Sequence, residues 1–210
     1  VSTIYFASSL KILKNMIVVA YLAVEGEAYP VDIVSFFGDR NFVYIAAFGA
    51  FTEGSYLTPQ DKKNMLGHQA YMLESVKSLT SIKSYRMRVE SEEITLEGEF
   101  IFGMVTNTIS VGGFKGLVTQ NVALNDGEFE VLLIRTPRTP LDLSNIVNYM
   151  FLKEEPNEYV HKFRTKALTV IPEEPVDWVL DGEFGGTRME TQIINLQKQI
   201  RIMRNPSKKQ

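Results

Sequence analysis

A succession of strand-like segments within residues 85–135 constrains the fold of this chain more than any other feature of its sequence. Apolar and polar residues alternate over 85–90 and again over 94–99, a period that is typical of half-buried strands. Residues 100–109 are more continuously apolar, as expected of a strand that is covered on both faces. Because these strands follow one another without intervening helices, they favour an antiparallel sheet over a parallel one.

The other elements are predicted from the same periodicities. We expect three helices, at residues 10–25, 59–79 and 140–152. Further strands are expected at 31–37 and 42–48 as a hairpin, at 129–134, 160–171 and 176–181, and at 191–196 and 199–203 as a closing hairpin. The predicted fold class is therefore mainly β or α+β, an antiparallel β-sandwich domain with about three flanking helices.

The composition excludes several classes of function. With 22 Lys and Arg against 25 Asp and Glu, the net charge of −3 offers no whole-surface attraction for nucleic acid or anionic lipid. There is no Cys, so disulfides and thiolate metal sites are excluded and a reducing cytoplasm is allowed. The longest apolar stretch near the start, residues 16–24, is too short to span a bilayer. Any contact with a membrane is therefore expected to be peripheral.

The sequence Asp181-Gly182-Glu183 is the main candidate for chemistry. It ends the predicted strand 176–181, and a strand that ends at a glycine can hold side chains rigidly beside a cleft. Two acids on either side of one glycine can place one carboxylate near a reacting hydroxyl, while the other orients that hydroxyl or binds a cation. The alternative is an ordinary Asp-Gly turn whose acids face water.

A second candidate is the turn Asn125-Asp126-Gly127, where the Asp126 carboxylate could bind a hard cation together with backbone carbonyls. The alternative is a turn that binds nothing. The sequence contains no nucleotide cradle of the P-loop or dinucleotide-binding type, and no convincing helix follows the glycine-rich stretch 111–116 to present amides to a phosphate. His68 and His161 lack the spacing of metal ligands and are interpreted as ordinary helix-face or strand-face histidines.

Four segments, read in order, resemble the C-terminal part of the bacterial diacylglycerol kinase-like lipid kinases, a group that includes sphingosine kinases and is related to the NAD kinases. The segments are FASSLKI at residues 6–12, VTN at 105–107 running to the glycines at 112–113, ALNDGEFEV at 123–131, and WVLDGE at 178–183. Their order and spacing match the family over nearly all of the 210 residues.

This resemblance implies an enzyme that uses ATP and Mg²⁺ to phosphorylate a lipid hydroxyl, with diacylglycerol as the expected acceptor. Asp181 and Glu183 would then be the catalytic acids, facing a cleft between two domains. A structural Mg²⁺ would be held by the Asp126 carboxylate, with main-chain oxygens of Ala123 and Glu128 as companions.

The same resemblance assigns substrate binding to Asn107, Gly112 and Gly113. Two departures from the family pattern limit the assignment of residues that contact ATP. The G-G-D-G-T segment that binds nucleotide in the family does not occur in this sequence, and Ile4 and Tyr5 stand where the next family element has Asn and Asp. We therefore assign no ATP contact to the start of the chain.

The domain organisation implied by the resemblance has three parts. Residues 1–28 are expected to be the edge of an N-terminal nucleotide-binding domain, 29–196 the β-sandwich domain that binds the acceptor, and 197–210 a closing strand and flexible tail. Because the nucleotide-binding signature is missing and the chain starts with Val, we expect a fragment that is inactive alone, with ATP bound mainly by the missing domain.

Two other hypotheses remain open. One is a non-catalytic β-sandwich module that binds lipid, sugar or a protein partner, and the other is a kinase for a sphingoid base, another lipid or a soluble polyol. The kinase hypothesis implies a cytoplasmic protein in peripheral contact with the inner face of the membrane, with a lipid substrate and no nucleic-acid partner. A homodimer is left open. For Asp181→Asn in the full-length protein, we expect lost activity with thermal unfolding close to that of the wild type.

Overall fold

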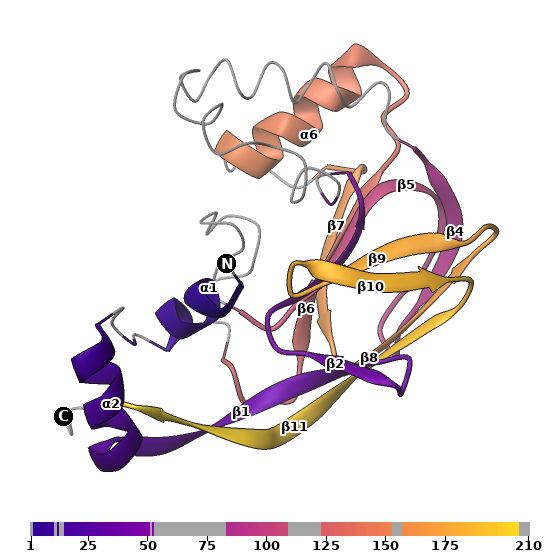
Figure 1. Ribbon diagram of the computed structural model, residues 1–210. Coiled ribbons are helices and arrows are strands. Elements are labelled where there is room, and N and C mark those ends of the chain that lie inside the picture. The colour runs from indigo at the N-terminus through magenta and orange to yellow at the C-terminus, as the bar shows by residue number, and fades with distance from the viewer. Residues whose placement is uncertain are drawn as a thin grey trace.

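The computed structural model describes residues 2–10, 12, 15–50, 52, 83–108, 123–152 and 157–205. Within these residues the chain forms one eleven-stranded, curled sheet and three helices (Figure 1). Every strand pair is antiparallel. This arrangement confirms the mainly β, antiparallel fold class. The predicted helix 59–79, His68, Gly112 and Gly113 lie outside the described residues.

The strands follow the order β10-β9-β3-β5-β4-β8-β11-β1-β2 across the sheet, while β6 pairs with β5 and β7 pairs with β6. Their bounds are β1 (Glu27–Phe36), β2 (Arg40–Phe42), β3 (Ile45–Gly49), β4 (Tyr85–Glu90), β5 (Thr95–Thr106), β6 (Phe129–Arg135), β7 (Val160–Thr165), β8 (Ala167–Pro172), β9 (Val176–Leu180), β10 (Glu183–Arg188) and β11 (Thr191–Arg204).

The curl brings the two ends of this strand order together. At the seam between β2 and β10, Nη1 of Arg40 donates a hydrogen bond to the backbone oxygen of Phe184 at 2.9 Å. Next to it, Nη2 of Arg188 is 3.1 Å from Oδ2 of Asp39, in the turn between β1 and β2. Side chains therefore bridge the two strands where the order begins and ends.

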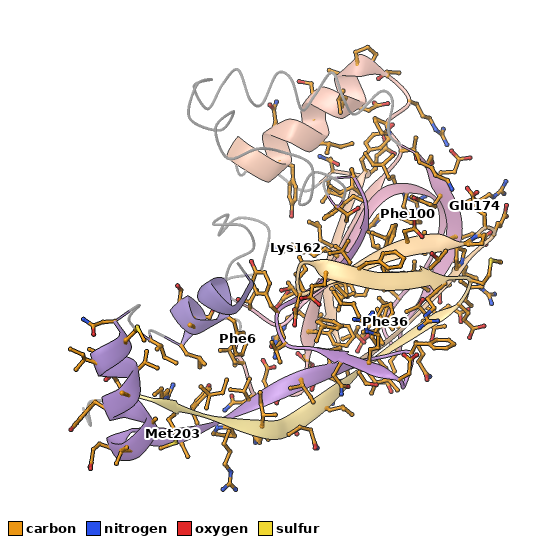
Figure 2. The ribbon with its side chains drawn as sticks, viewed as in Figure 1. Phe6, Phe36, Phe100, Lys162, Glu174 and Met203 are labelled. Carbon is orange, nitrogen blue, oxygen red and sulfur yellow. The ribbon has the colours of Figure 1, made fainter. Side chains whose placement is uncertain are left out.

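The main core packs inside the curled sheet. Trp178 lies at its centre and makes edge-to-face contacts with Phe36 and Phe48, with ring centroids 5.2 Å and 5.0 Å apart. Phe36 and Phe100 belong to the same buried cluster and lie within the curl (Figure 2). The strand that precedes Asp181 is therefore anchored by the largest buried side chain of the core.

Helix α6 (Pro140–Leu152) covers the opposite face of the sheet (Figure 1). Its buried Leu143 and Ile146 share a cluster with Met104 and Leu132, which lie on β5 and β6. The helix starts where the sequence predicts because Asp142 Oδ2 accepts hydrogen bonds from two backbone N–H groups in the turn before it, at 2.8 Å and 3.0 Å.

The predicted helix 10–25 is wrong in its first part. Helix α1 (Ser2–Ser9) ends before this range, and only α2 (Met16–Glu25) lies within it. The side chain of Asn15 caps α2 by accepting hydrogen bonds from the N–H groups of its first turn. The predicted end is confirmed, because the N–H of Gly26 bonds the oxygen of Leu22 at 2.9 Å.

Two predicted hairpins are corrected by the structure. The strand predicted at 42–48 is broken between β2 and β3, and β3 pairs with β5 and β9 instead of returning along β1. The closing hairpin predicted at 191–203 is one long strand, β11, which pairs with β1 and β8. Its apparent turn is a bulge at Lys198, where φ is +56°.

In the described part of the chain, no helix is long and apolar enough to cross a membrane. The β1 and β11 strands instead extend as a two-stranded ribbon away from the rest of the sheet, toward α2 (Figure 1). The predicted division of the chain near residues 28 and 196 stays a prediction.

Candidate functional site

Asp181 and Gly182 form the tight turn between β9 and β10. Both have positive φ values, +50° and +90°, and Leu180 and Glu183 are paired across the turn. A two-residue hairpin loop of this kind favours Asp-Gly because both residues occupy the left-handed region. The turn interpretation of this segment is therefore correct as far as the backbone is concerned. The two acids of the segment, Asp181 and Glu183, have different surroundings.

The carboxylate of Asp181 binds the backbone of the bend between β2 and β3. Its Oδ2 accepts a hydrogen bond from the N–H of Val43 at 3.0 Å. Its Oδ1 accepts from Tyr44 and Ile45, each at 2.9 Å. In return, the N–H of Asp181 donates to the oxygen of Ile45 at 2.8 Å. This carboxylate thus replaces the sheet partners that the backbone loses where the predicted strand 42–48 is broken.

Glu183, by contrast, is exposed to solvent at the start of β10. It lies on the strand that begins the order of the sheet, and the next side chain, Phe184, is also exposed. The two acids of the Asp-Gly-Glu segment therefore have separate surroundings, one bound to backbone amides and the other facing solvent. Glu183 is therefore the more exposed of the two acids.

Asn107 follows β5 and is completely buried. Its N–H donates to the oxygen of Tyr44 at 3.4 Å, and its Nδ2 donates to the backbone oxygen of Asp32 at 3.3 Å. No donor among the described residues reaches its Oδ1. Because Tyr44 also binds Asp181, the structure brings Asn107 next to the bend that Asp181 holds. Its predicted role in binding substrate stays a prediction.

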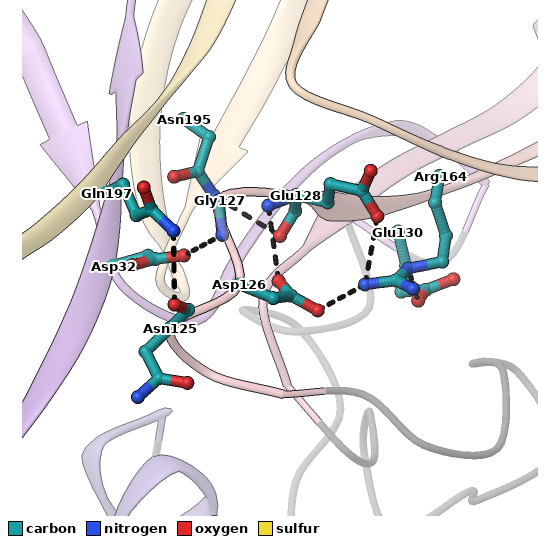
Figure 3. A network of polar contacts seen from close by, with 9 residues as sticks. All are labelled: Asp32, Asn125, Asp126, Gly127, Glu128, Glu130, Arg164, Asn195 and Gln197. Atoms are coloured by element: carbon teal, nitrogen blue, oxygen red, sulfur yellow. Dashed lines mark hydrogen bonds and ion pairs between the residues drawn. The ribbon is translucent and has the colours of Figure 1, made fainter.

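The turn Asn125–Gly127 is fixed by a buried acid, Asp32 (Figure 3). Oδ2 of Asp32 accepts from the N–H of Gly127 at 2.7 Å, and Oδ1 accepts from the N–H of Lys198 at 2.7 Å. The N–H of Asp32 donates to the oxygen of Leu124 at 2.8 Å. The sequence analysis missed Asp32, although an acid within the apolar stretch 31–37 is a signal for a buried, hydrogen-bonded carboxylate.

These contacts bring the four segments of the sequence resemblance together. Oγ of Ser9, in the first segment, is 2.7 Å from Oγ1 of Thr108, which follows the Val-Thr-Asn of the second. Phe6 of the first segment shares a buried cluster with Leu124 of the third. Asn107 connects to the fourth through the backbone of Tyr44. Segments far apart in the sequence thus form one continuous region.

Two of the predicted magnesium ligands, Asp126 and Glu128, are already engaged by other groups. Nη2 of Arg164 donates a hydrogen bond to Oδ2 of Asp126, and Oδ1 of Asp126 accepts from the N–H of Glu128 at 3.2 Å. The main-chain oxygen of Glu128 accepts from Nδ2 of Asn195 at 3.2 Å. In the described residues, no three Asp, Glu or His side chains are arranged to hold a metal ion. To use the Asp126 carboxylate, Mg²⁺ would have to displace Arg164, and the predicted ligand set of Asp126 with main-chain oxygens of Ala123 and Glu128 stays a prediction.

His161 on β7 accepts a hydrogen bond at its Nε2 from Nε of Arg135, at 2.8 Å. Burial, and then the positive charge of Arg135, lower the pKa of His161 below its ordinary value of 6.5. A neutral imidazole in this position is a structural acceptor, which agrees with the interpretation of His161 as a strand-face histidine.

Comparison with known proteins shows which proteins this chain is similar to. No family model matches it. It is 32% identical over 203 residues to a protein named diacylglycerol kinase from Bacillus subtilis (strain 168), covering 94% of this chain and 65% of that protein. It is 26% identical over 198 residues to a protein of the same name from Staphylococcus saprophyticus, covering 94% of this chain and 64% of that one.

Solved structures support the fold. The structure of a diacylglycerol kinase from Bacillus anthracis str. Sterne aligns with a TM-score of 0.65 at 19% identity, covering 96% of this chain and 63% of that one. A second structure from the same organism has a TM-score of 0.72 at 22% identity and covers 96% and 66%. The chain thus spans slightly less than two thirds of the length of the curated relatives, at 65% and 64%. Over nearly its whole length it is related to bacterial proteins named diacylglycerol kinase, which confirms the resemblance to the diacylglycerol kinase-like family.

Proposed function

We propose that this chain is the acceptor-binding part of a lipid kinase that transfers the γ-phosphoryl group of ATP to the hydroxyl of diacylglycerol. The observation that carries the proposal is the 32% identity to a protein of that name over 94% of the chain. The geometry supports the proposal, because Asn107, the bend at Tyr44 and the Asp181 turn lie in one region.

Within this proposal the two acids have different roles. Asp181 is a positioning residue, because three backbone N–H groups already occupy its carboxylate. Glu183 is the catalytic residue, because it is exposed and is held by the same rigid turn. As the acceptor oxygen attacks the γ-phosphorus, its proton passes to the Glu183 carboxylate, and ADP leaves with the oxygen that bridged the β- and γ-phosphorus atoms.

The proposal places ATP, with the Mg²⁺ that accompanies its phosphates in kinases, mainly against parts of the protein beyond this chain. Two observations support it. The chain spans about 65% of its Bacillus subtilis relative. In addition, α2 is apolar but exposes Met16, Ile17 and Val24, which are 89%, 81% and 78% accessible. An exposed apolar helix of this kind fits a surface that another part of the protein covers.

Peripheral contact with the inner face of the membrane, in a cytoplasmic protein, is part of the same proposal. Phe184, next to Glu183, is 59% exposed. Phe37, in the turn across the seam, is also exposed and lies under the Arg188 guanidinium, 4.9 Å from its ring centroid. Apolar side chains beside the catalytic acid could enter the headgroup region and bring Glu183 to the hydroxyl of a lipid that stays in the bilayer.

The test compares the full reading frame with the 210-residue chain in an assay of ATP-dependent phosphorylation in mixed micelles. We expect the whole protein to phosphorylate diacylglycerol and the chain alone to be inactive. Faster transfer to sphingosine or to glycerol would change the acceptor class. Robust turnover by the chain alone would overturn the assignment of ATP to other parts. Binding of lipid without transfer to any acceptor would refute the kinase and favour the non-catalytic binding module.

A further inference from the structure

Three carboxylates converge on the guanidinium of Arg164 (Figure 3). Asp126 comes from the Asn125–Gly127 turn, Glu128 from the residue before β6, and Glu130 from β6 itself. Arg164 is the direct cross-strand partner of Glu130 in the pairing of β6 with β7. The position of the arginine is therefore set by the sheet and does not depend on a surface side chain finding its partner.

The guanidinium contacts all three acids at once. Its Nη2 donates to Oδ2 of Asp126 and lies 3.1 Å from Oε2 of Glu128. Its Nε lies 3.0 Å from Oε1 of Glu130. The fixed fork of an arginine suits such multiple contacts with carboxylates better than a lysine ammonium does.

Burial makes this cation necessary. Only 2% of the Glu130 side chain is exposed, and a buried carboxylate without a cation nearby is strongly unfavourable. Lys162, two residues before Arg164 on β7, also stabilises the charge of Glu130 electrostatically. Glu130 thus has two cations of the protein near it, whereas Asp126 and Glu128 contact Arg164.

This arrangement uses the same oxygens that a metal ion would need. Nη2 of Arg164 lies between the Asp126 and Glu128 carboxylates, and the main-chain oxygen of Glu128 is already bound by Asn195. Mg²⁺ requires near-octahedral oxygen ligands at about 2.0–2.1 Å. It would have to displace the guanidinium, which carries the same sign of charge, before it could use the carboxylates.

We infer that Arg164 takes the place of a structural Mg²⁺ at the Asn125–Gly127 turn, so that the protein folds this turn with its own cation. The turn is then independent of Mg²⁺, and any requirement of the enzyme for Mg²⁺ arises where the nucleotide binds. This inference rests on the contacts of Arg164 and does not depend on the proposed kinase activity.

The first test measures thermal unfolding of the 210-residue chain without nucleotide, in EDTA and in increasing concentrations of MgCl₂. We expect the wild-type Tm to stay constant within about 1 °C up to millimolar Mg²⁺, and titration calorimetry to show no saturable binding, because a ligand that binds the folded state at 100 times its Kd would raise the Tm by several degrees. A saturable rise in Tm that Asp126→Asn abolishes would overturn the inference.

The second test removes the cation. Arg164→Gln should lower the Tm in EDTA by roughly 5–15 °C, because it removes the guanidinium that lies 3.0 Å from the buried Glu130 carboxylate. It should also create a response to Mg²⁺, since the three carboxylates are then free to attract a dication. Arg88→Gln, at an exposed ion pair on β4, is the matched control and should change neither property.

If Arg164→Gln does not fold, Arg164→Lys provides the same comparison, because it keeps the charge but loses the fork. We expect Arg164→Lys to have a Tm in EDTA below that of the wild type and a rise in Tm with Mg²⁺ that the wild type lacks. An Arg164 variant that folds with the wild-type Tm and does not respond to Mg²⁺ would contradict the inference. If the Arg164 variants behave as expected but the full-length wild-type protein transfers phosphate to no acceptor, only the proposed function is refuted.

Discussion

Replacement of Asp181 by alanine is expected to destabilise the fold, although Asp181 belongs to the segment expected to carry the chemistry. The alanine removes the acceptor for three backbone N–H groups at the bend between β2 and β3, two at 2.9 Å and one at 3.0 Å. Tyr44, in the middle of this bend, is buried. Its amide therefore has limited access to water that could replace the lost carboxylate.

The magnitude follows from these three bonds. A hydrogen bond to a charged group contributes about 1.5–3 kcal/mol. Because the three bonds share one carboxylate and some N–H groups regain water, we expect Asp181→Ala to lower the free energy of unfolding by about 3–5 kcal/mol. For a chain of this size, that loss corresponds to a decrease in Tm of roughly 6–20 °C. Asp181→Asn keeps one acceptor oxygen and should lose about 1–3 kcal/mol.

The assay is chemical and thermal denaturation of the variants beside two controls. Glu183→Ala changes the exposed acid of the same turn, and Asp177→Ala changes an exposed acid on the same strand, β9. Both should stay within about 0.5 kcal/mol of the wild type. The structure thereby revises the sequence-based expectation that Asp181→Asn leaves unfolding unchanged. A Tm for Asp181→Ala within 1–2 °C of the wild type would refute the positioning role.

Two further predictions concern buried polar groups. Asp32→Ala should lower the free energy of unfolding in urea by about 3–5 kcal/mol, because the N–H groups of Gly127 and Lys198 lose their acceptor, and Asp32→Asn should have a smaller effect. The lowered pKa of His161 predicts that the unfolded chain binds a proton at higher pH than the folded chain. Stability from this group is therefore present above about pH 6.5 and is lost as the pH falls through the lower, folded pKa, so His161→Gln should flatten the stability profile between pH 7 and 5.

The parts of the fold that depend on neighbouring residues could be predicted from the sequence. The alternation over residues 85–90 marks β4, and the Asp-Gly pair at 181–182 marks a hairpin turn because left-handed backbone favours these residues. The fully buried strand predicted at 100–109 is confirmed over the second half of β5. In each case the structure depends on residues that are neighbours in the sequence, so the local pattern is enough to predict it.

The bend at Val43 and Tyr44 could not be predicted in this way, because its hydrogen-bond acceptor, Asp181, lies 138 and 137 residues away in the sequence. Arg164 is a similar case, since Asp126 is 38 residues before it and only the pairing of β6 with β7 brings them together. The sequence prediction split the long strand β11 into two strands for a related reason. A bulge at Lys198 and a turn have similar local signals, and the partner strand β1 decides between them.

The different surroundings of the two acids in the Asp-Gly-Glu segment could not be predicted from the sequence. The sequence shows two acids around Gly182, and it cannot show that one faces backbone amides while the other faces solvent. This difference arises from the curl of the sheet, which brings β9 beside the bend that follows β2. The proposed roles of the two acids rest on that arrangement.

The most direct measurement is the rate of diacylglycerol phosphorylation by the full-length protein carrying Glu183→Gln, with its unfolding measured in parallel. If Glu183 accepts the proton of the hydroxyl, kcat should fall by about 10²–10⁴-fold while the Tm stays within 1–2 °C of the wild type. A variant that phosphorylates diacylglycerol at the wild-type rate, or that loses activity only because it unfolds, would contradict the assignment of catalysis to the exposed acid.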